Sequence, residues 1–92
     1  MQLMDCYDSE TQVQDKRLND LYKKLSNIQS PETKKLLLTA QRNWLQYRDN
    51  WIKFLKTQEN AVMMPEYYIS MFLLDATKEQ ADHLETILSE LE

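Results

Sequence analysis

Apolar side chains recur at helical spacing in three segments of the chain, and the middle segment has the clearest pattern. It covers residues 31–57 and follows Ser30, a good N-cap. Pro31 suits the first helical position because its missing N–H has no intrahelical partner there. The apolar positions of this segment spread over roughly 200° of the helix surface, which is wider than the usual amphipathic stripe. We therefore expect a long central helix that needs partners on two sides.

Two further helices are predicted, one on each side of the middle segment. Residues 5–28 place most of their apolar side chains on one face, and the helix ends before Pro31. A loop follows the middle helix at residues 57–64, and the third helix covers residues 65–90, with Pro65 at its first position. The chain therefore predicts one domain over residues 1–92, an all-α three-helix antiparallel bundle.

The start of the third helix can be interpreted in two ways. Tyr67, Met71 and Leu74 project from a different face than the main apolar stripe, which includes Leu73 and Ala76. A three-helix core covers one such face more easily than both. Either this helix start is packed on all sides, or Tyr67, Met71 and Leu74 form a surface for a second copy or another protein.

Polar side chains interrupt the apolar arc of the middle helix. Gln41 and Arg48 are seven residues apart, on nearly the same line of the helix, and a buried guanidinium needs a carboxylate or several carbonyls. Asp15 and Asn19 lie at the flank of the apolar face of the first helix, where they could meet the middle helix. We predict that Arg48 is buried and pairs with Asp15, Asn19 or carbonyl groups. The predicted structural polar core consists of Asp15, Asn19, Gln41 and Arg48.

The composition offers little for catalysis. The chain has no glycine, which excludes the glycine-rich phosphate loops of nucleotide-binding motifs. Cys6 is the single cysteine and His83 the single histidine, so we expect no intrachain disulfide and no metal cluster. We predict no catalytic residue, no metal site and no cofactor, and therefore no enzyme.

The net charge of −4 hides an uneven distribution along the chain. Residues 16–56 carry ten basic and three acidic side chains, residues 1–15 carry four acids and no base, and residues 75–92 carry six acids and Lys78. Packing of oppositely charged helices explains this division, and steering of a charged partner is the alternative. The aromatic residues among the basic ones lie in the apolar arc, so we predict no nucleic-acid binding.

Two stretches carry a resemblance to a known family. Residues 15–25 read DKRLNDLYKKL, and residues 40–49 read AQRNWLQYRD. The pattern D..LN..Y..L with a later AQ..W..YRD resembles the LprI-type lysozyme-inhibitor family, formerly a domain of unknown function. Family members tend to have a cysteine shortly after the RD pair and another in the third helix, where this chain has Trp51 or Ile52 and about Phe72. The usual envelope disulfides are therefore missing here.

The resemblance implies a bacterial protein, periplasmic or secreted, with a lysozyme as its protein partner. We therefore predict a non-enzymatic protein-binding domain that blocks a muramidase by occlusion. A self-associating helical adaptor, as a homodimer, and an immunity protein for a secreted toxin are the alternatives. No segment reaches the ~20 apolar residues of a membrane helix, and no signal pattern stands at the N-terminus, so a cytoplasmic location stays open. The candidate partner surface comprises Tyr67, Met71, Leu74, Asp82 and Glu85.

Overall fold

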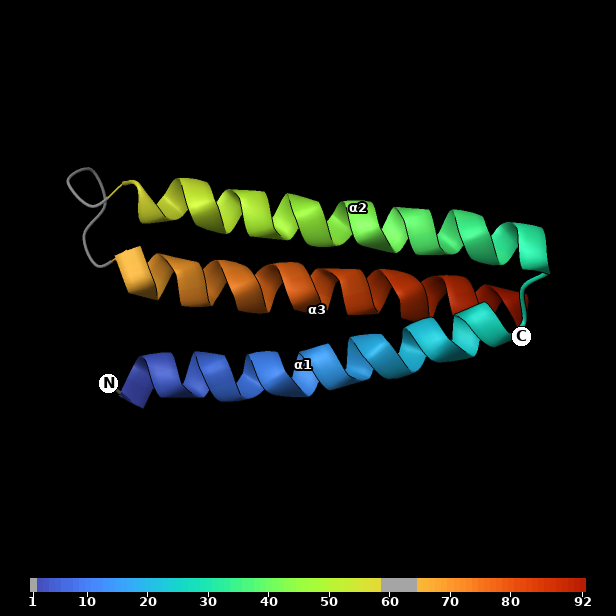
Figure 1. Ribbon diagram of the computed structural model, residues 1–92. Helices are drawn as coiled ribbons and strands as arrows, with labels where there is room; N and C mark the ends of the chain where they lie inside the picture. Colours follow the sequence, from blue (N-terminus) through green and yellow to red (C-terminus); the bar gives the residue numbers. More distant parts are fainter. Residues whose placement is uncertain (1, 59–64) are drawn as a thin grey trace.

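Three helices make up the computed structural model, which describes residues 2–58 and 65–92. They are α1 (Gln2–Asn27), α2 (Pro31–Lys56) and α3 (Pro65–Leu91), and the described residues contain no strand. Consecutive helices run antiparallel, so that α1 and α3 point in the same direction (Figure 1). The predicted all-α fold class is confirmed. The predicted loop between α2 and α3 falls largely on residues 59–64, outside the described part.

Local chemistry explains where α2 begins and ends. The Ser30 hydroxyl accepts a hydrogen bond from the Thr33 N–H at 3.3 Å, which satisfies one of the free donors of the first turn. At the other end, the N–H of Thr57 bonds the carbonyl of Phe54 at 3.0 Å. Basic side chains, including Lys56, occupy the last turn and complement the negative end of the helix dipole. The predicted N-cap, Ser30, is therefore a real cap.

The hydrophobic core lies between α1 and α3. Every buried residue of the main cluster comes from these two helices, and α2 adds only partly buried side chains at its edge. The cluster consists of Leu18, Leu21 and Leu25 of α1 with Ala81, Leu84 and Leu88 of α3. Burial of these side chains supplies most of the hydrophobic stabilisation, because α2 has no buried residue of its own.

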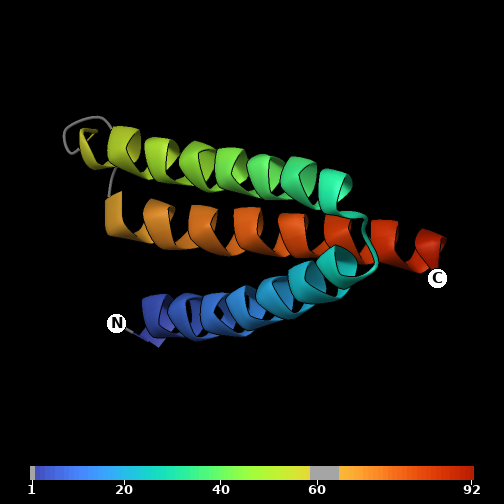
Figure 2. The same cartoon turned by 45° about the vertical axis from the view of Figure 1, so that its right-hand side comes forward.

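The helix in the middle of the bundle is α3, not α2. Both views place α3 between the other two helices (Figures 1 and 2), and α1 and α2 each pack mainly against it. The expectation that α2 has partners on two sides was wrong. The physical reason lies in α3, whose first half is apolar nearly all round and therefore accepts one neighbour on each side. The wide apolar arc of α2 is left partly uncovered.

Candidate protein-binding surface

Arg48 of α2 joins all three helices. Its Nη1 donates to the Asp15 carboxylate on α1 and to the Thr77 hydroxyl on α3, each at 3.3 Å. The guanidinium also lies 5.0 Å from the centre of the Trp44 ring, within the range of a cation–π contact. The Arg48 side chain is 17% exposed, but that of Asp15 is 46% exposed. The ion pair is therefore buried on one side only.

The four predicted polar-core residues line one groove between α1 and α2, with a volume of about 510 Å³. Gln41 accepts a hydrogen bond from Gln80 of α3 at 3.4 Å, whereas Asn19 is exposed. We predicted a buried polar core, but Asn19 is exposed and the other three side chains are only partly buried. Because α1 and α2 pack mainly against α3, the space between them stays open and the Asp15 side chain stays partly exposed. The groove is therefore accessible to another molecule.

Two members of the polar contacts, Thr77 and Gln80 of α3, were not predicted as partners. Thr77 is fully buried, and its hydroxyl accepts from Arg48. It lies four residues before Ala81, on the same apolar face, so a polar residue at a core position was the available signal. Gln80 interrupts the apolar stripe of α3 in the same way. Polar residues that interrupt the apolar faces of α2 and α3 thus bond to one another across the two helices.

Tyr67, Met71 and Leu74 do not form an open patch. The hydroxyls of Tyr67 and Tyr7 lie 3.4 Å apart, and their rings meet edge to face at 5.6 Å. This hydrogen bond is the main reason that the pKa of Tyr7 is raised above its ordinary value. Met71 and Leu74 are half-buried. Tyr67 therefore packs against α1, whereas the neighbouring Tyr68 is 43% exposed, so the start of α3 is covered only in part.

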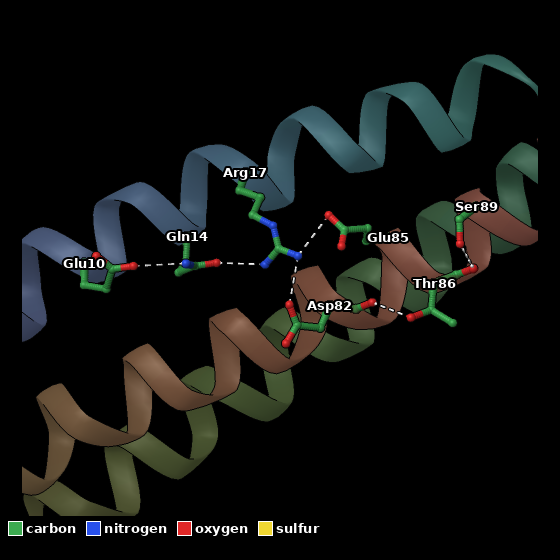
Figure 3. A network of polar contacts seen from close by, with 7 residues as sticks. All are labelled: Glu10, Gln14, Arg17, Asp82, Glu85, Thr86 and Ser89. Carbon is green, nitrogen blue, oxygen red and sulfur yellow. Dashed lines mark hydrogen bonds and ion pairs between the residues drawn. The ribbon is translucent and has the colours of Figure 1, made fainter.

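Asp82 and Glu85 form ion pairs within the chain (Figure 3). Nη2 of Arg17 lies 2.8 Å from the Asp82 carboxylate and 3.2 Å from that of Glu85. The hydrogen bond with Asp82 is the largest of the effects that raise the pKa of Arg17. The other amino group of Arg17 donates to Gln14, which in turn donates to Glu10. The charges of Asp82 and Glu85 are thus partly compensated before any partner arrives.

A different surface is open, on the part of α2 that α3 does not cover. Tyr47, Trp51 and Phe54, here called the aromatic face, are 51%, 46% and 51% exposed. The rings of Trp51 and Phe54 meet edge to face at 5.7 Å, and the three residues with Asn50 enclose a shallow hollow of about 490 Å³. The wide apolar arc of α2 was the sequence signal for this surface. It indicated a second partner, which the described residues do not supply.

Among the described residues, no three His, Cys, Asp or Glu side chains are grouped so that they could hold a metal ion. Cys6 is exposed and unpaired. No described helix has both the length and the hydropathy needed to cross a bilayer.

The described residues form an all-α three-helix bundle with an open aromatic face on α2. The chain belongs to the LprI family, because the family's sequence profile, described as "Lysozyme inhibitor LprI", matches residues 1–84. This confirms the family resemblance carried by residues 15–25 and 40–49. It is a family of inhibitors, which agrees with a role other than catalysis. Comparison with curated proteins and with solved structures gives no significant match.

Proposed function

We propose that this chain is a non-enzymatic binding domain that inhibits a lysozyme-type muramidase by covering its substrate cleft. Family membership supports the class of target. The observation that carries the proposal is the aromatic face, where Tyr47, Trp51 and Phe54 are each about half exposed on one side of α2. Aromatic side chains dominate the binding energy of protein interfaces because they bury much area and lose little side-chain entropy. The same family membership favours a location outside the cytoplasm, where lysozymes act.

The acidic residues of the predicted partner surface have a smaller role in this proposal. The family resemblance implies a basic target, and carboxylates near the interface accelerate the approach of such a protein. Because Arg17 offsets part of the charge of Asp82 and Glu85, these two residues with Arg17 add only one net negative charge to the long-range attraction. Tyr67, Met71 and Leu74 are weaker candidates than the aromatic face, since packing against α1 already engages Tyr67.

The test is inhibition of cell-wall lysis by purified lysozymes of more than one type. We expect a stoichiometric complex on size exclusion and a loss of lysis that weakens as salt is added, because salt screens the attraction between the charged surfaces. A folded parent protein that inhibits none of the lysozymes at several-fold excess would contradict the proposal.

Self-association is the second candidate function, and one observation favours it. Six exposed positions of α2, four of them apolar and two of them asparagines, follow one another at alternating spacings of four and three, the spacing of a coiled-coil seam. They are Leu36, Ala40, Asn43, Tyr47, Asn50 and Phe54. Such a seam could pack against the same helix of a second copy. Sedimentation over a wide concentration range decides this: a stable homodimer without effect on lysozymes would favour an adaptor over an inhibitor.

A further inference from the structure

A pocket of about 270 Å³ adjoins the aromatic face, at the junction of α2 and α3. Trp44 and Tyr47 line it from α2, and Phe72, Asp75 and Glu79 line it from α3. The pocket therefore combines aromatic rings and two carboxylates in a space that fits one long side chain. Its position beside Tyr47 makes it continuous with the aromatic face.

The two carboxylates of the pocket, Asp75 and Glu79, differ from the other acidic side chains of α3 in their surroundings. Asp75 and Glu79 are exposed and lie one helical turn apart, a spacing at which like charges destabilise a helix. Among the residues that the structure describes, neither takes part in an ion pair within 4.0 Å. This differs from the next pair along the same helix, Asp82 and Glu85, which share Arg17. A cation placed between Asp75 and Glu79 would relieve their repulsion.

The aromatic rings of the pocket suit the same cation. Tyr47 and Phe72 lie with their centres 6.4 Å apart and their planes inclined by 55°, so both rings border the space beside the carboxylates. Aromatic faces attract cations, and a planar guanidinium stacks on them while its N–H groups bond carboxylates. The chain already contains this combination once, where Arg48 lies over Trp44 and bonds Asp15.

We infer that this pocket receives an arginine side chain from the surface of the inhibited protein. The inference rests on the proposed function and deepens it by naming the group that is recognised. The guanidinium bonds the carboxylates of Asp75 and Glu79 and stacks against Tyr47 or Phe72. The aromatic face then covers the apolar surface around that arginine, and the acidic pocket makes a basic protein the preferred partner.

The first experiment compares two double variants with equal change of net charge. Asp75→Asn/Glu79→Gln removes the carboxylates of the pocket, and Glu66→Gln/Glu90→Gln removes two exposed carboxylates near the ends of the same helix. Since the first change also removes a like-charge repulsion, we expect it to leave the fold intact. Binding to the inhibited lysozyme, measured by calorimetry, should weaken about tenfold or more for the pocket variant and about twofold or less for the control. Equal losses of affinity in the two variants would show that net charge alone causes the effect and would overturn the proposed arginine pocket.

The second experiment tests the aromatic wall. Tyr47→Phe keeps the ring and should bind like the parent, whereas Tyr47→Leu keeps an apolar side chain without the ring and should bind several-fold more weakly. Equal binding by the phenylalanine and leucine variants would overturn the stacking part of the inference.

A third experiment separates failure of the pocket from failure of the proposed function. N-acetyl-arginine methylamide is titrated into the folded protein at constant ionic strength, and the aromatic NMR signals of Tyr47 and Phe72 are followed. Saturable shifts in the parent and in the Glu66→Gln/Glu90→Gln control, lost in Asp75→Asn/Glu79→Gln, support the pocket even if no lysozyme is inhibited. No saturable shift in the parent, or equal or stronger binding of the lysine analogue, overturns the assignment to arginine.

Discussion

The α1–α3 pair and α2 differ in what their apolar side chains do. Between α1 and α3, leucines such as Leu18 and Leu84 are 3% exposed and form the core. On α2 no residue is buried, and Leu36 is 70% exposed, although α2 has more large apolar side chains than α1. The difference fits the proposed division of roles, in which α1 and α3 supply stability and α2 supplies a surface for another molecule.

The largest expected effect comes from truncating the core. Leu84→Ala should lower the free energy of unfolding by about 2–5 kcal/mol, because it removes buried surface and leaves a cavity. The matched change on α2, Leu36→Ala, should alter it by less than about 0.5 kcal/mol, since that side chain is largely hydrated. Urea denaturation of both variants measures the contrast, and similar losses would contradict the division.

The next effect concerns the side chain that ties α2 to the pair. Arg48→Ala should destabilise the protein by about 2 kcal/mol, because it leaves the buried Thr77 hydroxyl without its donor. This is below the roughly 3–5 kcal/mol of a fully buried pair, since the half-exposed Asp15 carboxylate keeps its water. Arg42→Ala is the control, an exposed arginine on the same groove. If the two variants melt alike, Arg48 does not hold the helices together.

The smallest effect is a dependence on alkaline pH at the packed start of α3. The pKa of Tyr7 is raised in the folded state, mainly by its hydrogen bond with Tyr67. A group whose pKa is raised on folding stabilises the protein below its unfolded pKa of about 10. That stabilisation is lost as the pH rises through the raised value. Tyr67→Phe removes the hydrogen bond, so its stability should fall less steeply above about pH 10 than that of the parent. Parallel pH profiles in urea denaturation would refute this contribution.

The helices and one long-range contact could be predicted from the sequence, and the order of packing could not. Ser30 and Pro31 mark the start of α2 because capping is a local property. Arg48 pointed to a carboxylate because a guanidinium inside an apolar arc needs one, and the structure places Asp15 there. The first inference depends on chemistry within one helix. The second depends on the need of a single guanidinium for a carboxylate.

The choice of the middle helix depends on all three helices at once. The width of the apolar arc on α2 indicates how much surface can be covered, but the covering group can belong to the same chain or to another molecule. The start of α3, around Tyr67 and Met71, is apolar nearly all round, which was the better indicator of a helix between two neighbours. For the same reason the aromatic face could not be located before the packing was known.

The most direct test of the division measures stability and inhibition on the same variants. Trp51→Ala/Phe54→Ala removes two of the three rings of the aromatic face, and Val13→Ala/Ile28→Ala removes two exposed apolar side chains outside α2. We expect both to unfold within about 0.5 kcal/mol of the parent. Only the aromatic-face variant should lose lysozyme inhibition, by about tenfold or more. Unchanged inhibition by that variant, or inhibition lost equally by both, would contradict the assignment of binding to α2.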